Sequence, residues 1–310
     1  MKYRISQDRT FLMGLAMIGV VCCHYGWSVI PGFTAFFSRF GSWGVDIFLF
    51  LSGFGCVYAL NKYSTSIFLK KRFLRLMPTC IIAGIFIYCI DLYFHAERTI
   101  TYFPVRVLSL NRWYIQAILI CYLLSPFAYS ILKKYRAIGL LVMICCFIIT
   151  QSFIPYDRVW KISWIFNRLP VFLIGMYVAS FDLKLNRFLY IASGQCLAAA
   201  IIIRCLEING VDSIIPWVWF LAASMPFVCY TLSLIKPIFD KLHLTKMVEL
   251  FGLYSLEIYL IHEYFLWALY AVTIPLWCKY ILYLLLVISI CVILKATAKL
   301  IQGRLQKLIV

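Results

Sequence analysis

Long apolar runs, separated by short polar or charged connections, dominate the chain. Ten of these runs are long enough to cross a hydrocarbon core of ~30 Å as helices, at a rise of ~1.5 Å per residue. They lie near residues 10–30, 42–60, 76–94, 113–132, 137–155, 163–181, 188–206, 214–234, 248–270 and 278–300. The pattern predicts an all-α integral membrane protein with about ten transmembrane helices in one bundle.

The composition supports this class. Of the 310 residues, 64% are hydrophobic and only 13% are charged, which is outside the usual range for soluble domains. The net charge of +17 could indicate nucleic acid, but the cations fall in short clusters between apolar runs, so we expect no nucleic-acid partner. No repeat or linker divides the chain, which predicts a single membrane domain over residues 1–310 without an appended soluble domain.

The basic residues also predict an orientation. With the N-terminus inside, 20 of the 29 Lys and Arg residues fall on the inner side of the membrane. By the positive-inside rule, both termini are then cytoplasmic. The first apolar run is too long for a signal-peptide core and lacks a small-residue cleavage site, so it is expected to be retained. The longer outer connections, roughly 31–41 and 95–112, are where an outer substrate would be met.

Two candidate sites stand out among these runs. His24 lies about 20 Å into the membrane from the inner side, too deep for an interface anchor, and is either a hydrogen-bonded packing residue or a catalytic base. Arg72 and Arg75 share one helix face near a helix start, where guanidinium groups suit phosphate oxygens. The alternative for this pair is ordinary orientation by positive charge.

Other polar residues inside the runs have two interpretations each. Asp46 either reaches solvent at the outer interface or orients His24 or a backbone group. Ser255, Tyr259 and His262 share one helix face and form either part of a site or a polar seam between helices. Trp113 and Tyr114 fit an interfacial aromatic belt nearly as well as a substrate wall. No CxxC or Cys/His array is present, so we expect no metal.

Six local motifs follow one another along the chain. They are the helix over 11–24 that ends in His24, GVDIFLFLSGF over 44–54 with Ser52, KRFLRLMP over 71–78, NRWY over 111–114, RLPVFLIG over 168–175 with Arg168, and GLYSLEIYLIH over 252–262. In this order they resemble the membrane-bound acyltransferase 3 family, the bacterial O-acyltransferases of cell-surface polysaccharides. The resemblance covers essentially the whole chain.

The resemblance implies a function and a location. It implies transfer of an acyl group, most simply acetyl, from cytoplasmic acyl-CoA to a hydroxyl of a cell-surface or lipid-linked polysaccharide such as capsule, O-antigen or exopolysaccharide. Arg72 and Arg75 are then expected to bind the phosphates of acetyl-CoA. His24 acts as base or, alternatively, as acyl acceptor, oriented by Asp46 or His262. The protein is expected in the bacterial cytoplasmic membrane, with lipid around it and a glycan acceptor outside.

One position departs from the family pattern. The family often has an Arg eleven residues before the first-helix His, and here that position is Met13. Arg9 lies one helical turn earlier on the same face and is expected to serve the same space. Two other classes remain open: a transporter or flippase of a glycan or lipid precursor, and a non-catalytic protein of polysaccharide assembly or sensing. The latter would tolerate loss of His24.

Overall fold

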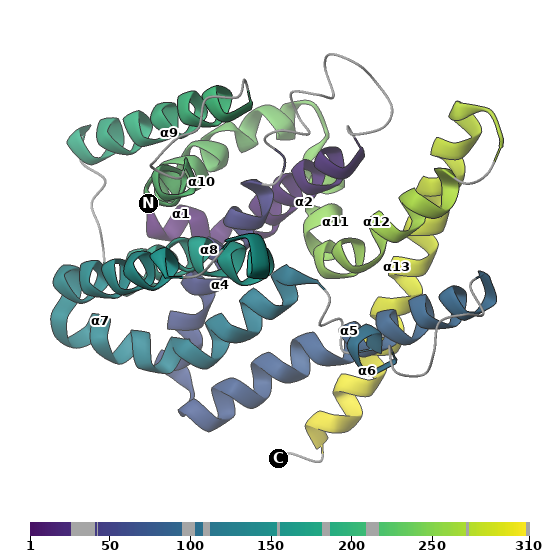
Figure 1. Ribbon diagram of the computed structural model, residues 1–310, viewed down its shortest axis with the longest axis horizontal. Coiled ribbons are helices and arrows are strands. Elements are labelled where there is room, and N and C mark those ends of the chain that lie inside the picture. The colour runs from purple at the N-terminus through teal and green to yellow at the C-terminus, as the bar shows by residue number, and fades with distance from the viewer. Residues whose placement is uncertain are drawn as a thin grey trace.

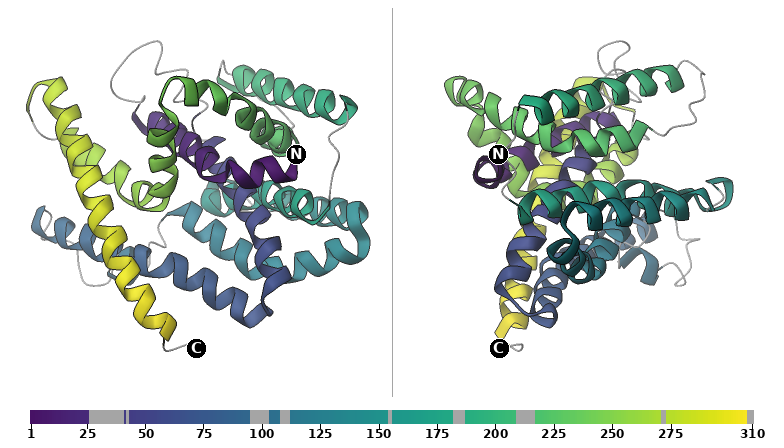
Figure 2. Two further views of the ribbon diagram at one scale, coloured as in Figure 1. Left: turned by 180° about the vertical axis from the view of Figure 1, so that it is seen from behind. Right: turned by 90° about the vertical axis from the view of Figure 1, so that its left-hand side faces the viewer.

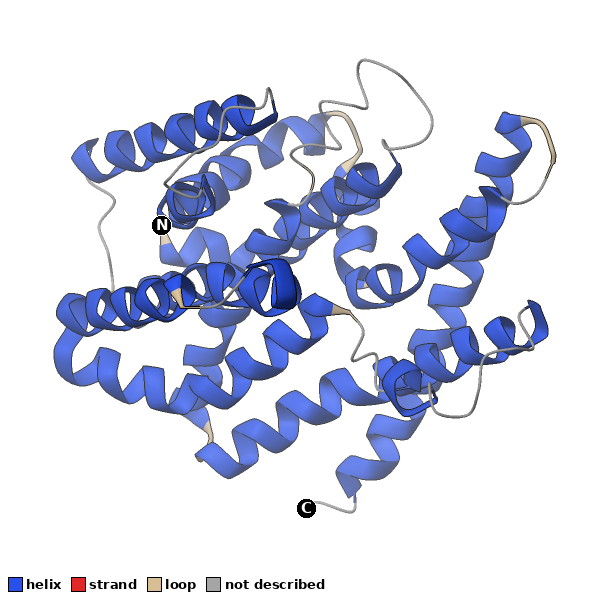
Figure 3. Ribbon diagram, in the orientation of Figure 1, coloured by secondary structure: helices blue, strands red, loops and turns tan. Residues whose placement is uncertain are grey.

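Helices make up the computed structural model, as Figure 3 shows. It describes residues 1–25, 41, 43–94, 103–107, 112–153, 156–181, 187–208, 217–270 and 273–307, and within these ranges there is no strand. The helices, labelled in Figure 1, are α1 (Lys2–Gln7), α2 (Arg9–Tyr25), α4 (Trp43–Lys62), α5 (Thr65–Phe94), α6 (Phe103–Val107), α7 (Trp113–Ser152), α8 (Tyr156–Ser180), α9 (Arg187–Ile208), α10 (Trp217–Lys241), α11 (Thr245–Leu253), α12 (Ser255–Tyr270) and α13 (Leu276–Lys307).

Seven of the helices in the described ranges are long and apolar enough to cross a membrane. These are α4, α5, α7, α8, α9, α10 and α13. Large apolar side chains such as Leu141 on α7, Ile202 on α9 and Ile293 on α13 are more than half exposed. In water they would form unfavourable patches, whereas lipid accommodates them. The chain is therefore an all-α protein with the features of a multi-pass membrane protein.

Three of the predicted runs differ in the structure. The runs at 113–132 and 137–155 form the single element α7, whose two segments meet at Arg136, a residue with φ of 49° and ψ of −126°. The run at 248–270 is not one helix: it breaks at Tyr254 into α11 and α12. Sequence hydropathy could not reveal this break because both pieces are apolar. The predicted outer connections at 31–41 and 95–112 lie largely outside the described residues.

The most buried part of the core surrounds α4, which packs against α8, α2 and α7. Glycines allow the closest of these contacts. Gly53 of α4 faces the backbone carbonyl of Phe172, and Gly175 of α8 faces that of Phe50, so neither position has room for a Cβ. Small residues of this kind let membrane helices approach backbone to backbone. The glycines of two sequence motifs therefore set the α4–α8 contact.

A second group of helices, α5, α12 and α13, lies beside this core (Figure 2). The helices α2 and α11 connect the two groups, again through glycines: Gly14 of α2 faces Val248, and Gly252 of α11 faces the carbonyl of Thr10. The long α13 contacts both α12 and α5. The helices α2, α5, α12 and α13 surround one space together with parts of α4 and α7, and the break between α11 and α12 falls at its wall.

Candidate functional site

A cavity of about 310 Å³ occupies that space. Seven of the residues singled out in the sequence line it, together with Met13: Arg9, Ser52, Arg72, Arg75, Tyr114, Ser255 and Tyr259. The last helix adds Lys295 and Lys299, which the sequence had suggested only as orientation charges. Thus residues of α2, near the start of the chain, and of α13, near its end, meet in one cavity.

Three guanidinium groups gather in this cavity. Arg72 is buried: its Nη2 donates to the Gly55 carbonyl at 2.7 Å, and its guanidinium lies 5.3 Å from the ring of Tyr122. A Cβ at Gly55 would lie 3.5 Å from Nη2 of Arg9 and 3.7 Å from Nη2 of Arg72, so both groups converge on this glycine. Arg75 is exposed. Arg72 and Arg75 are both near enough to Arg9 for their positive charges to act on it.

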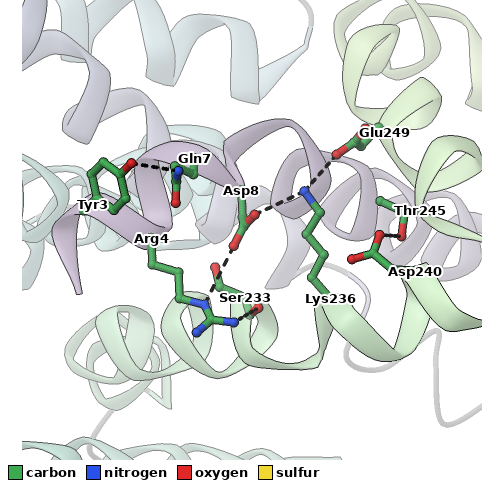
Figure 4. A network of polar contacts seen from close by, with 9 residues as sticks. All are labelled: Tyr3, Arg4, Gln7, Asp8, Ser233, Lys236, Asp240, Thr245 and Glu249. Carbon is green, nitrogen blue, oxygen red and sulfur yellow. Dashed lines mark hydrogen bonds and ion pairs between the residues drawn. The ribbon is translucent and has the colours of Figure 1, made fainter.

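The acidic residue next to Arg9 in the sequence is already paired. Lys236 of α10 contacts Asp8 Oδ1 at 3.1 Å and Glu249 Oε1 of α11 at 3.0 Å, and Arg4 lies 3.9 Å from the other Asp8 oxygen (Figure 4). Asp8 is thereby held toward α10, and Arg9 receives no ion pair from a described residue. Its buried Nε has no hydrogen-bond partner there. A guanidinium in this state is available to an anion.

The acidic residue of the cavity, Glu257, is paired as well. Lys295 of α13 lies 3.8 Å from Glu257, donates to the carbonyl of Leu253 and sits 4.3 Å from the ring of Tyr254. Lys295 therefore caps the end of α11 at the break between α11 and α12. Because Lys295 forms the ion pair with Glu257, none of the three arginines is ion-paired with this carboxylate in the described structure.

Two histidines lie close together where the other end of α2 meets α12. The ring centroids of His24 and His262 are 5.0 Å apart, with the rings inclined at 67°. His262 is 1% exposed, and its Nδ1 lies 2.9 Å and 3.1 Å from the carbonyl oxygens of Ile258 and Tyr259. Since a carbonyl only accepts, Nδ1 carries the hydrogen and Nε2 has a free lone pair. That Nε2 is buried without a partner among the described residues.

An ion pair that the sequence did not single out stands beside these histidines. Arg112, just before α7, pairs with Glu263 of α12, and the charges of both residues act on His24 and His262. The available signal was local: Arg112 belongs to the NRWY motif and Glu263 follows His262 directly. Among the described residues, Glu263 is therefore the carboxylate whose charge acts on His24.

Two tyrosines join the cavity to the histidines. Tyr114 and Tyr259 line the cavity with ring centroids 5.0 Å apart, and the Tyr259 ring is 6.1 Å from that of His262. The basic group and the histidine pair thus stand at opposite sides of this wall. Along α2, Arg9 and His24 are about 22 Å apart at ~1.5 Å per residue. The arrangement can bind an anion at one end and exchange a proton at the other.

Comparison with known proteins agrees with this chemistry. A family model for the acyltransferase 3 group, described as an acyltransferase domain, matches residues 11–296. The chain belongs to this acyltransferase family. Comparisons with curated proteins and with solved structures give no match. The matched range includes every residue of the cavity and of the histidine pair except Arg9, Ala298, Lys299 and Gln302.

Besides the two histidines, three of the predicted residues of this acyltransferase do not line the cavity: Asp46, Trp113 and Arg168. Asp46 of α4, 1% exposed, forms an ion pair with Arg168 of α8, which is 3% exposed. The Arg168 guanidinium lies 5.3 Å from the ring of Trp113, 5.7 Å from that of Trp164 and 5.9 Å from that of Trp217. The interpretation of Asp46 as a solvent-accessible residue is therefore wrong, and its ion pair is made with Arg168, not with His24. We conclude that the Asp46–Arg168 pair joins α4 to α8.

Proposed function

We propose that this acyltransferase carries an acyl group, most simply acetyl, from acyl-CoA in the cytoplasm to a hydroxyl of an extracytoplasmic or lipid-linked polysaccharide. The main support for the proposal is that the site has two chemically different ends, one basic and one with two histidines. Three arginines without an ion pair among the described residues face the cavity at one end, and a histidine pair lies behind Tyr259 at the other. A donor with phosphates at one end and a reactive carbonyl at the other fits such a site.

The residues of the cavity fit the donor chemically. Arg9, Arg72 and Arg75 repel one another, and binding of phosphate groups would convert this repulsion into charge-assisted hydrogen bonds. The unpartnered Nε of Arg9 supplies one donor that no described protein group uses. Phosphate groups suit guanidinium better than lysine because two oxygens can be bound at once.

The proposed orientation places the arginines at the cytoplasmic side. The basic residues before α2, between α4 and α5 and at the end of α13 favour the inner face, so both termini are cytoplasmic in this arrangement, as expected for a bacterial inner-membrane protein. About ten crossings are then made by the long helices, by the two segments of α7 and by the shorter α2 and α11–α12. Under this topology His24 lies in the outer half of the membrane.

The residues at the histidine end supply the proton chemistry. His24 takes the proton from the acceptor hydroxyl as its oxygen attacks the thioester carbonyl, so that a C–O bond forms and the C–S bond breaks. The proton then passes to the departing thiolate. His262 keeps a neutral acceptor nitrogen beside His24, and the paired Arg112 and Glu263 hold the local charge balanced. The function of His24 as an acyl acceptor is the alternative within the same reaction.

The direct test uses sealed vesicles that enclose the polysaccharide. Acetyl-CoA with a label on its acetyl group is added at the cytoplasmic face of the protein. Wild-type protein should attach the label covalently to the enclosed glycan, and His24→Ala protein inserted at the same level should not. Glycan that crosses the membrane without gaining label would favour the flippase alternative. Equal labelling by both proteins would remove His24 from the mechanism.

A further inference from the structure

The cavity contains one more cation, Lys299, which neither forms an ion pair with a described residue nor belongs to the group of three arginines. Lys295 is occupied by Glu257, Leu253 and Tyr254. One turn further along α13, Lys299 also lines the cavity, but it is exposed and forms no ion pair with a described residue. We propose that Lys299, together with Arg75, binds the 3′-phosphate of the CoA donor and makes the enzyme selective for donors that carry it. This inference rests on the proposed function.

The positions of the basic residues suggest which phosphate each of them meets. Arg72 is buried and Arg9 is half-buried, whereas Arg75 and Lys299 are exposed. Arg75 and Lys299 are also near enough to Glu257 and Lys295 for both charges to act on that pair. The cations therefore fall into two groups by their depth in the cavity. Arg9 and Arg72 form the deeper group, called the inner group, and Arg75 and Lys299 form the exposed group at the cavity mouth, called the outer group.

The chemical order of the donor matches this division. In CoA the thioester is followed by the pantetheine arm, then the diphosphate, and last the nucleoside with its 3′-phosphate. When the thioester points toward Tyr259 and the histidines, the diphosphate meets the inner group and the 3′-phosphate meets the outer group. A lysine is suited to a terminal phosphate because it binds as a point charge without a fixed fork.

The helix that carries Lys299 is held against the arginine helix. Gln302 Nε2 of α13 donates to the Arg75 carbonyl of α5 at 3.2 Å, and Lys299 lies one turn earlier on the same face. This contact keeps Lys299 and Arg75 on adjacent helices at the cavity. A charge needed only for membrane orientation would not have to be held in this register.

The experiment compares acetyl-CoA with acetyl-3′-dephospho-CoA as donors for wild-type protein, Lys299→Met, Lys299→Arg and the control Lys246→Met. Lys246 is an exposed lysine outside the cavity that the proposed orientation places on the cytoplasmic side. Lys246→Met therefore removes the same charge at another position. Wild-type and Lys246→Met proteins should prefer acetyl-CoA by about tenfold or more in kcat/KM, as expected for one charge-assisted bond. Lys299→Met should lose most of this preference by using acetyl-CoA less well, and Lys299→Arg should retain it.

Several results would overturn the inference while leaving the proposed function in place: an unchanged donor preference in Lys299→Met, an equal loss with both donors, or a wild-type protein that uses both donors equally. Calorimetric binding of CoA and 3′-dephospho-CoA to the purified protein provides a measure that does not need transfer. If no acetyl transfer occurs from either donor, the proposed function fails. Calorimetry then decides separately whether Lys299 discriminates the 3′-phosphate.

Discussion

The two ends of the site handle charge in opposite ways. At the cavity end, Arg9, Arg72 and Arg75 lie together while the nearby carboxylates of Asp8 and Glu257 are held by Lys236 and Lys295. At the histidine end, the charges of Arg112 and Glu263 balance each other. The first end has positive charge that no described carboxylate neutralises, so it favours the binding of an anion. The second has a neutral nitrogen available for a proton, and in the proposed mechanism this difference separates donor binding from catalysis.

The largest expected effect comes from His24 at the histidine end. His24→Ala should lower kcat for acyl transfer by roughly 100- to 10,000-fold, the usual contribution of a general base. The level of protein in the membrane should not change. His24 is half-buried, and its replacement by the smaller Ala leaves no unpaired buried charge. Rates normalised to membrane-inserted protein provide the measurement. Near-normal acylation by the variant would mean that His24 has a packing role only.

The buried pair of Asp46 and Arg168, which joins α4 to α8 outside the cavity, should affect stability and not donor affinity. Asp46→Leu or Arg168→Leu alone leaves a buried charge without its partner, which costs about 3–5 kcal/mol. The double variant should recover much of this loss because no unpaired charge remains. Melting temperatures in detergent, measured for both single variants and the double variant, would show the pattern. Additive losses would indicate that Asp46 and Arg168 act separately.

At the cavity end, Arg72→Ala and Arg75→Ala should raise KM for acyl-CoA by roughly ten- to a hundred-fold, because each variant loses a charge-assisted bond worth ~1.5–3 kcal/mol. Lys62→Ala provides the matched control, since Lys62 belongs to the same basic stretch but does not line the cavity. Donor titrations at saturating acceptor give the KM values. If all three variants show the same small effect, the cluster serves orientation alone.

The sequence predicted the helical class and several polar members of the cavity, including Arg9, Arg72 and Arg75, because hydropathy and motif spacing report local properties. Hydropathy does not mark the break at Tyr254, where Lys295 donates to the Leu253 carbonyl from a helix more than 40 residues later. The partner of Asp46 and the pairing of Arg112 with Glu263 are also long-range. Spacing along one helix shows which residues share a face, but it does not show which side chain faces them from another helix.

The smallest effect concerns the position where the family often has an arginine. Arg9 and Met13 line the same cavity, so Arg9→Ala should weaken donor use by about tenfold, and Arg9→Ala/Met13→Arg should restore part of it. Met13→Arg alone tests for crowding of the added side chain. Full activity and correct orientation of Arg9→Ala would reduce Arg9 to an orientation charge.

The division into a donor end and a proton end is tested most directly by one measurement: the rate of acyl transfer as a function of acyl-CoA concentration for Arg75→Ala and His24→Ala side by side. We expect Arg75→Ala to approach the wild-type rate as the donor becomes saturating. We expect His24→Ala to remain slow at every donor concentration, with KM little changed. The reverse pattern, with His24→Ala rescued by donor and Arg75→Ala not, would contradict the account.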